Sequence, residues 1–298
     1  MSKPRTIVSG GTGYVGRFIV EELLAAGHAV TVLGRKTPPP GFFSEGVGFH
    51  PLTLDPETAS KVPFAGADFL VHAAFDHVQG KYRGGEGDDP DGFRRRNLDG
   101  TTALFEAAKA AGVRRSVFLS SRAVYGPRPR GLELHEDDEP KPDTLYGEVK
   151  LMGERALERI AGAGFEGVNL RVTGVYGPAG PGRAHKWAEL FADYLAGRKI
   201  APRAATEVQG EDVASAVRLV LETELLGETV FNLSDLIIDR RDLLAIVKRL
   251  TGAAHGLPEA GDKKALNVMN TERLRGLGWQ PGGLELFEKT ISRLLSHP

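Results

Sequence analysis

A glycine-rich turn between a short strand and a helix constrains the fold of this chain more than any other feature. Gly10, Gly13 and Gly16 follow the β-branched segment 6–8 and open the segment 15–26, whose apolar residues recur at helical spacing. Glycine allows a tight turn there and lets the backbone approach a ligand closely. The first N–H groups of the helix, with their partial positive charge, would face a pyrophosphate. Such a triad is often only a turn, but its place between strand and helix predicts a dinucleotide site.

The segments that follow continue the alternation of strand and helix. Short apolar runs at 29–33, 68–72 and 116–120 predict strands, and 93–111 carries apolar residues at helical spacing. Strands that alternate with helices form a parallel sheet covered on both faces, which is the doubly wound (Rossmann) α/β fold. We therefore expect a dinucleotide-binding domain over residues 1–173.

The stretch 174–183 is rich in Gly and Pro, and the sequence after it is less regular in rhythm. This change predicts a smaller C-terminal α/β substrate-binding lobe over residues 174–298. Whether some C-terminal segments return to the first domain stays open. The elements expected in this lobe are helices at 185–196, 211–222, 240–251 and 284–295 and a strand at 230–233.

Composition narrows the classes of function. The 298 residues are 41% hydrophobic and 26% charged, which is typical of a soluble globular protein. The formal net charge is −1 and the basic residues are scattered, so nucleic acid is not expected as a partner. The chain has no cysteine and its histidines stand apart, so we expect no disulfide, thiolate nucleophile or metal site. Without a signal peptide or a membrane-spanning stretch, we expect no membrane partner and a cytoplasmic location.

Tyr146 and Lys150 are four residues apart in a segment with helical spacing, which places a phenol and an ammonium side by side. A phenol with an ordinary pKa of roughly 10 is a poor base, and a nearby cation stabilises its anion. The spacing arises often by chance, and alone it would indicate a solvated helix face. Together with the glycine turn, it favours acid–base chemistry at a carbinol or carbonyl group.

The end of the second expected strand bears on the choice of cofactor. NAD-binding folds usually place a carboxylate there for the ribose hydroxyls, but here Leu33 is followed by Gly34 and Arg35. An arginine would pair with a 2′-phosphate, and a carboxylate would repel one. The sequence therefore favours NADP over NAD, unless Arg35 only points into solvent.

Several separate motifs occur in a fixed order along the chain. They are Gly-Gly-Thr-Gly-Tyr-Val-Gly at 10–16, His-Ala-Ala at 72–74, Asn97 with Gly100-Thr101, Ser-Ser-Arg-Ala-Val-Tyr-Gly at 120–126, Tyr146 to Lys150, Val-Tyr-Gly-Pro at 175–178, Asp-Val-Ala at 212–214 and Leu-Gly-Trp at 277–279. Together they resemble the extended short-chain dehydrogenases/reductases of the NAD(P)-dependent epimerase/dehydratase family. The likeness runs nearly end to end and implies NAD or NADP as cofactor, a small-molecule substrate and a homodimer packed through 93–111 and 145–160.

The resemblance implies a catalytic role for Ser121, Tyr146 and Lys150. Ser121 would hydrogen-bond the reacting oxygen and Tyr146 would exchange a proton with it, while Lys150 lowers the phenol pKa and bonds the nicotinamide ribose. Asn97 would support the site from the neighbouring helix, or would cap a helix start instead. The residues expected to contact the cofactor are Gly10, Gly13, Tyr14, Val15, Gly16, Arg35, Ala73, Ala74, Asn97, Tyr146, Lys150 and Val175.

The chain departs from the family pattern on the substrate side. Gly174, Ala205 and Gln209 stand where relatives carry an asparagine, an arginine and a histidine. Arg183 and Arg203 are near enough in sequence to substitute for the arginine. The expected catalytic residues are all present, whereas the residues expected to hold a substrate diphosphate are replaced. A free sugar derivative or another small carbonyl compound therefore fits better than a standard nucleotide sugar. The adenine contact is open between 52–53 and Asp55.

These observations favour an NAD(P)-dependent enzyme that transfers a hydride at a carbinol or carbonyl carbon of a sugar or sugar-like molecule, as an epimerase, a dehydratase or a net dehydrogenase/reductase. One alternative is an NADPH-dependent reductase of a non-sugar carbonyl compound. Another is a non-catalytic dinucleotide-sensing protein, against which the intact Ser121, Tyr146 and Lys150 argue.

Overall fold

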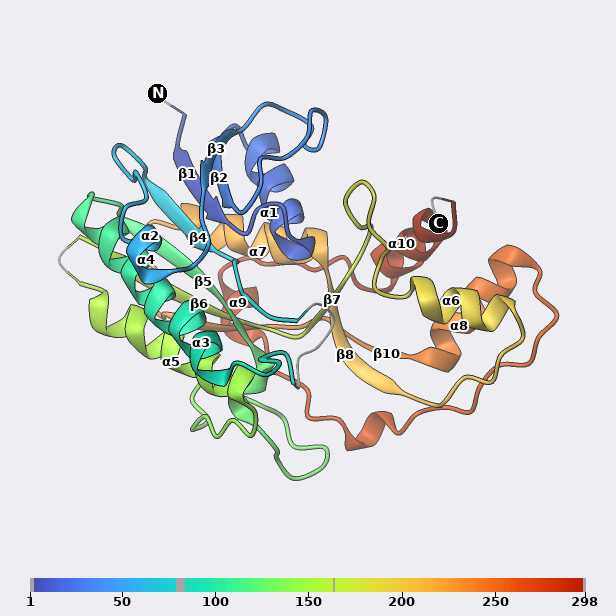
Figure 1. Cartoon of the computed structure of the whole chain (residues 1–298). Helices are drawn as coiled ribbons and strands as arrows, with labels where there is room; N and C mark the ends of the chain where they lie inside the picture. The colour runs from blue at the N-terminus through green and yellow to red at the C-terminus, as the bar shows by residue number, and fades with distance from the viewer. Residues whose placement is uncertain (1–2, 79–83, 163, 297–298) are drawn as a thin grey trace.

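A sheet of seven parallel strands forms the centre of the larger lobe (Figure 1). The computed structural model describes residues 3–78, 84–162 and 164–296. From β1 the sheet grows in one direction through β2 and β3 and in the other from β4 onward, so β1 and β4 flank the switch point where doubly wound folds bind ligands. The predicted Rossmann sheet is confirmed. In spatial order its strands are β3 (Gly48–Pro51), β2 (Ala29–Gly34), β1 (Arg5–Ser9), β4 (Phe69–His72), β5 (Arg115–Ser121), β6 (Glu166–Val172) and β9 (Val230–Leu233).

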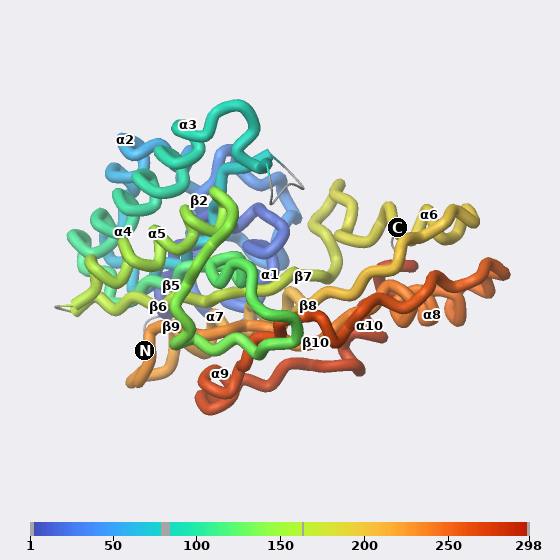
Figure 2. Tube along the Cα trace, turned by 90° about the horizontal axis from the view of Figure 1, so that it is seen from below, coloured from blue at the N-terminus to red at the C-terminus, as the bar shows by residue number. Residues whose placement is uncertain are grey.

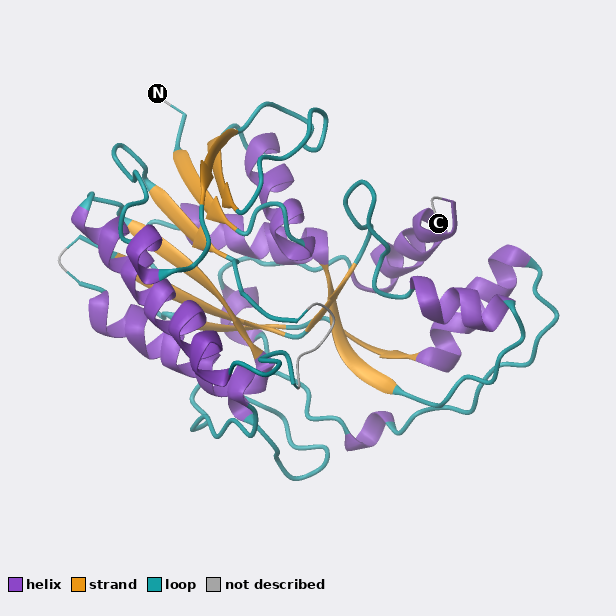
Figure 3. Cartoon of the chain, in the orientation of Figure 1, coloured by secondary structure: helices purple, strands orange, loops and turns teal. Residues whose placement is uncertain are grey.

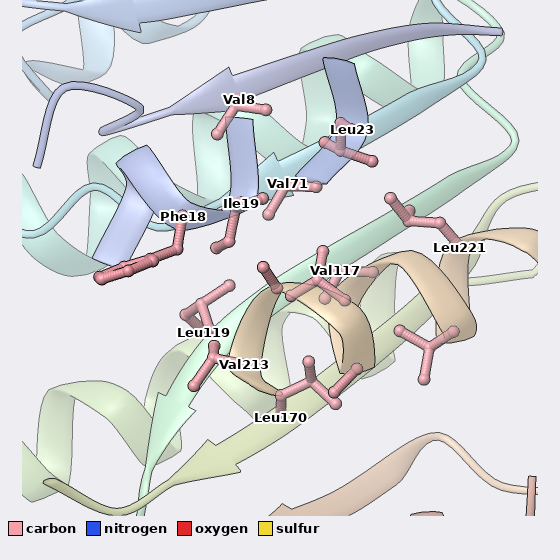
Figure 4. Close-up of a cluster of buried hydrophobic side chains, with 14 of the residues drawn as sticks. Val8, Phe18, Ile19, Leu23, Val71, Val117, Leu119, Leu170, Val213 and Leu221 are labelled. Atoms are coloured by element: carbon pink, nitrogen blue, oxygen red, sulfur yellow. The ribbon is translucent and has the colours of Figure 1, made fainter. Parts of the chain in front are cut away.

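Helices cover both faces of this sheet (Figure 3). On one face, Phe18, Ile19 and Leu23 recur at helical spacing and pack with Val213 and Leu221 over the central strands (Figure 4). The buried faces of the helices on the other side form a second cluster with the sheet. The helices of the first face are α1 (Tyr14–Ala25) and α7 (Gly210–Glu222), and those of the second are α2 (Pro56–Ala59), α4 (Gly100–Ala110) and α5 (Leu145–Ile160).

A smaller lobe extends to one side of the sheet (Figure 2). It contains a three-stranded sheet in which β7 (Gly174–Tyr176) pairs parallel to β8 (Ala204–Gln209), and β10 (Leu236–Asp239) pairs antiparallel to β8. Stacked aromatic rings of Tyr176 and Trp187 form the middle of its core. The helices around that core are α6 (Ala188–Leu195), α8 (Arg240–Thr251) and α10 (Gly283–Ser296).

Several element bounds differ from those expected. The helix expected at 93–111 is a continuous run of α3 (Pro90–Arg94), a π-helical turn (Arg95–Asp99) and α4. The strands β7, β8 and β10 carried no clear periodicity in the sequence. The remaining short elements are 3₁₀ turns at Arg122–Tyr125 and Lys263–Ala265 and the helix α9 (Glu272–Gly276).

Two segments that were expected in the smaller lobe lie in the larger one. Helix α7 packs against α1, and β9 is the last strand of the seven-stranded sheet. Their apolar patterns predicted the elements correctly, but a pattern does not state which sheet an element joins. The chain therefore leaves the larger lobe after β6 and returns to it for α7, for β9 and later for α9, whose Leu274 packs in the same core.

Candidate active site

The glycine turn after β1 is held by close backbone contacts. Gly10 has φ +71°, and a Cβ on it would lie 2.7 Å from the backbone of Ala74. A Cβ on Gly16 would overlap the carbonyl oxygen of Gly10, which accepts a 2.8 Å hydrogen bond from the N–H of Gly13. Among the described residues no side chain caps α1, so its first N–H groups face the switch point. This is the geometry that a dinucleotide pyrophosphate requires.

Tyr14 and Val15 serve the turn in different ways. The Tyr14 hydroxyl donates a 2.6 Å hydrogen bond to the carbonyl of Gly177, in the loop after β7. Val15 packs against the core beneath α1. Tyr14 thus links the cofactor turn to the smaller lobe, which its sequence position did not reveal.

The loop after β4 lies directly against the glycine turn. The N–H of Ala73 donates to the carbonyl of Ser9, and that of Ala74 to the Ser9 hydroxyl. His72 is fully buried between this hydroxyl and Thr101, at 2.6 and 2.8 Å, and burial lowers its pKa to about 3. A neutral imidazole therefore fixes the loop, and His72 is a structural residue.

Asn97 lies in the π-helical turn and clamps the same loop. Its Oδ1 accepts from the N–H of Asp76 and its Nδ2 donates to the carbonyl of Asp76, both at 2.7 Å. The Nδ2 also donates to the carbonyl of Phe93 at 3.0 Å. The alternative that Asn97 caps a helix start is wrong, because these bonds hold a neighbouring loop. Through them Asn97 acts on the site indirectly.

The beginning of α5 is packed closely against the turn that follows β5. The Thr144 hydroxyl caps the helix by accepting from the N–H of Gly147, and a Cβ on Gly147 would lie 2.6 Å from the carbonyl of Ala123. The Ser121 hydroxyl accepts a 3.1 Å bond from the N–H of that same Ala123. Tyr146, in the first turn of α5, and Ser121 are thereby brought to the same turn.

Lys150 is almost completely enclosed. Its Nζ donates a 2.6 Å hydrogen bond to the carbonyl of Leu119 and lies 4.4 and 4.7 Å from the ring centres of Phe75 and Phe118. Burial lowers the pKa of Lys150 to about 7, against the opposing influence of the Glu154 carboxylate. An ammonium at this place is therefore balanced between its charged and neutral forms at neutral pH.

A buried ionic network under the site was missed in the sequence. Glu154 accepts from Ser120 and receives bonds of 2.8 to 3.3 Å from the guanidinium of Arg171, which also donates to the carbonyl of Glu136. The only signal was spacing, because Glu154 lies four residues beyond Lys150 on the same helical face. The network ties α5 to β5 and β6.

Arg35 and Asp55 lie near the adenosine side of the switch point. The Arg35 side chain is 80% exposed at the end of β2, with Nη1 3.8 Å from Asp76 Oδ1. Asp55 caps α2 and pairs with Arg95 at 2.5 Å, and that bond lowers the pKa of its carboxyl. Both of its oxygens are thus engaged by the protein itself.

An ion pair fills the space that a side chain at residue 174 would occupy. A Cβ on Gly174 would lie 2.5 Å from Glu207 Oε2 and 2.6 Å from Lys186 Nζ, and these two groups pair with each other. Next to Gly174, Val175 pairs with Val208 in the small sheet. The pair borders a cleft of about 290 Å³ whose wall includes Lys199, Arg203, Ala205 and Arg240.

Gln209 and Arg183 do not join this cleft. The Gln209 side chain caps α7 by accepting from the N–H of Glu211, and it is fully buried. Arg183 is exposed and outside the cleft wall, whereas Arg203 is part of that wall. Of the two arginines considered as substitutes, Arg203 therefore lines the cleft and Arg183 does not.

Two further features of the described residues limit the kinds of site. Within the ranges given above, no group of three or more His, Asp or Glu side chains is placed to hold a metal ion. No helix in the described part of the chain is long and apolar enough to cross a bilayer.

The glycine turn at the switch point and the Ser121, Tyr146 and Lys150 cluster define the class of a short-chain dehydrogenase/reductase-type Rossmann protein. The sequence profile of the NAD dependent epimerase/dehydratase family matches residues 6–234, and the chain belongs to that family. Its cofactor is accordingly NAD or NADP, as predicted.

Individual relatives agree with this assignment. A UDP-glucose 4-epimerase of Lacticaseibacillus casei is 28% identical over 92% of this chain and 91% of its own length. An L-arabinose 1-dehydrogenase (NAD(P)(+)) of Haloferax volcanii is 32% identical over 56% of this chain and 66% of its own. The structure of Thermus thermophilus UDP-glucose 4-epimerase with NAD superimposes with a TM-score of 0.77 and 29% identity, covering 98% of both chains. Three other curated relatives are matched over only 35%, 47% and 55% of their lengths.

Proposed function

We propose that this protein is an NAD(P)-dependent enzyme that transfers a hydride at a carbinol or carbonyl carbon of a sugar or sugar-like small molecule. The observation that carries the proposal is the placement of Tyr146 and Lys150 beside the end of β5, where Ser121 lies. The site is continuous with the glycine turn, because Gly10 touches Ala74 and the Phe75 ring contacts Tyr146.

Each catalytic side chain has a defined task in this reaction. The Ser121 hydroxyl uses a lone pair to accept from Ala123, so its proton is available to the substrate oxygen. Tyr146 exchanges a proton with that oxygen, and a charged Lys150 stabilises the phenolate. The bound nicotinamide supplies or takes up the hydride. Replacing Tyr146 by Phe in a cofactor-loaded screen of sugar and carbonyl substrates tests the assignment, and unchanged turnover of every accepted substrate would refute it.

For the substrate we propose a sugar derivative without a nucleotide. The Lys186–Glu207 pair over Gly174 and the small side chain of Ala205 support it, because they replace two groups associated with a diphosphate. A carboxylate and an ammonium at a cleft wall suit the hydroxyl groups of a polyol. Lys186→Met should raise KM for the sugar about tenfold and change kcat little. The proposal is contradicted if nucleotide sugars are turned over with a higher kcat/KM than free sugars.

Arg35 supports a preference for NADP, and with it net oxidation or reduction over epimerisation. Its side chain is 80% exposed just after the end of β2, where it could meet a 2′-phosphate, and its contact with Asp76 is as long as 3.8 Å. Epimerases regenerate their cofactor in each turnover and usually hold NAD tightly. The absorbance of the purified protein separates the two functions, since co-purifying NAD would indicate an epimerase.

We also propose a homodimer packed through α4 and α5, in the cytoplasm. Met152, on α5, is 44% exposed and would be covered in such a dimer. The lack of cysteine is compatible with a reducing compartment. Light scattering on wild type and on Met152→Glu tests the dimer, and equal masses would exclude this interface.

A further inference from the structure

Phe75 is the aromatic residue that covers the proposed catalytic pair. It follows Ala74 in the loop after β4, and its ring meets the Tyr146 ring edge-on with centres 5.1 Å apart. The same ring lies 4.4 Å from Lys150 Nζ. One side chain outside the catalytic group therefore contacts both members of the pair.

The ammonium of Lys150 has little access to water. It is 4% exposed, it donates to the carbonyl of Leu119, and the rings of Phe75 and Phe118 lie on two sides of it. An aromatic face attracts a cation but gives it less stabilisation than a full hydration shell. The hydration of Lys150 thus depends on whether the Phe75 ring stays in place.

The charged and titratable groups around Lys150 are otherwise engaged. On α5, Glu154 is bonded to Ser120 of β5 and to Arg171 of β6. On β4, His72 is buried and neutral. Phe75 and Phe118 are the uncharged aromatic neighbours of Lys150, and of the two only Phe75 lies in a loop, whereas Phe118 is buried inside β5.

Hydrogen bonds to the next residue, Asp76, hold the backbone at Phe75 in place. Asn97 bonds both the N–H and the carbonyl of Asp76, and the side chain of Asp76 pairs separately with Arg96. On its other side the Phe75 ring packs edge-on against Phe93, with centres 5.5 Å apart. The backbone clamp and this ring contact hold Phe75 over the pair.

We propose that Phe75 is a positioning residue: its ring, held by the Asn97 clamp on Asp76, orients the Tyr146 phenol and excludes water from Lys150, and so sets the pH range in which the pair works. The catalytic meaning of this role rests on the proposed function, but the effect on Lys150 does not need a substrate. The reduced pKa of Lys150, about 7 because of burial, is the state that the ring maintains.

The test is an NMR titration of the Lys150 ε-carbon in ¹³C-lysine-labelled protein, with the resonance identified by its loss in Lys150→Met. In Phe75→Leu the midpoint should rise by about one pH unit, a tenfold gain in proton affinity, because water reaches the ammonium. Phe75→Met should behave likewise and replaces Phe75→Leu if that variant does not fold. Phe75→Tyr, which keeps the ring, should restore the original midpoint.

Matched variants separate positioning from general loosening. Phe165→Leu removes a buried ring just before the start of β6, at the end of the sheet away from Ser121. It should leave the midpoint unchanged. Asn97→Ala should raise it, whereas Asp76→Ala, which retains the backbone clamp, should not. An unchanged midpoint in both Phe75→Leu and Phe75→Met would overturn the proposal, as would an equal rise in Phe165→Leu. A shifted midpoint in a protein without activity would instead count against the proposed function alone.

Discussion

Lys150 and Glu154, on α5 beside β5, are each 4% exposed, whereas the Lys186 side chain in the cleft of the smaller lobe is 30% exposed. On α5 each of these buried charges is bonded by neighbours from β5 and β6. In the cleft, Arg203 and Arg240 lie without an acidic partner within 4.0 Å among the described ion pairs, and burial and the charge of Arg203 lower the pKa of Arg240. The charges near Lys150 are thus bonded within the protein, whereas Arg203 and Arg240 in the cleft are available to a ligand.

Tyr146→Phe should have the largest effect on function. Removing the phenolic proton should lower kcat by about 10²- to 10⁴-fold, because Tyr146 is the group proposed to exchange the proton and Ser121 only hydrogen-bonds the reacting oxygen. The dissociation constant for NADPH, measured by fluorescence, should stay within a factor of about two. A comparable loss of NADPH binding would show that the variant disturbs the cofactor site instead.

Glu154→Gln should have the largest effect on stability. It leaves the buried Arg171 guanidinium without its anion, which should lower the free energy of unfolding by about 3–5 kcal/mol in a urea titration. Glu148 lies on the same helix as Glu154 and forms an exposed ion pair with Arg94 of α3. Glu148→Gln breaks that pair and should lower the free energy of unfolding by about 1 kcal/mol or less. Equal losses in the two variants would remove the contrast between enclosed and open charges.

Asp212, whose carboxylate joins α7 to the segment before α10, should give stability a pH dependence. Burial raises the pKa of its carboxyl from 3.8 to about 6, although Oδ1 accepts from the N–H of Gly282. A raised carboxyl pKa means that stability is fully present below about pH 4 and falls as the pH rises to about 6. Asp212→Asn should therefore be the more stable protein above pH 6, by up to about 3 kcal/mol.

Thermal unfolding of Asp212→Asn and wild type at several pH values measures this difference. The control is Glu288→Gln, which changes an exposed carboxylate of α10 that pairs with Arg249 and should change the melting temperature by the same amount at pH 4 and at pH 8. A gain for Asp212→Asn that is the same at pH 4 and pH 8 would argue against titration of Asp212.

Of the substitutions at Tyr146, Glu154, Asp212 and Arg35, Arg35→Ala should give the smallest effect. Loss of one exposed guanidinium should weaken NADPH binding about tenfold and leave NADH binding unchanged. Lys36→Ala, a neighbouring exposed cation, should weaken NADPH less. If both variants lose the two cofactors equally, Arg35 does not read the 2′-phosphate.

Local patterns predicted the parts of the site that depend on neighbouring residues. The glycine turn and the full length of α5 follow from spacing and capping signals that lie within a few residues of one another. The roles of Asn97 and Phe75 depend on contacts with residues 21 and 71 positions away in sequence, for which no local pattern exists. The segment before α10 is likewise held by a residue distant in sequence, since Asp212 accepts from Trp279 and Gly282.

The return of the chain to the larger lobe has a consequence for how the molecule can be divided. Because the backbone passes between lobes after β6, after β8 and after β9, and again on either side of α9, a single proteolytic cut in any one of these connections leaves the halves joined by the others. The substrate lobe is consequently not a cassette that can be exchanged by splicing at one boundary. Transfer of its specificity to another scaffold would require residue-by-residue grafting onto β7 and β8.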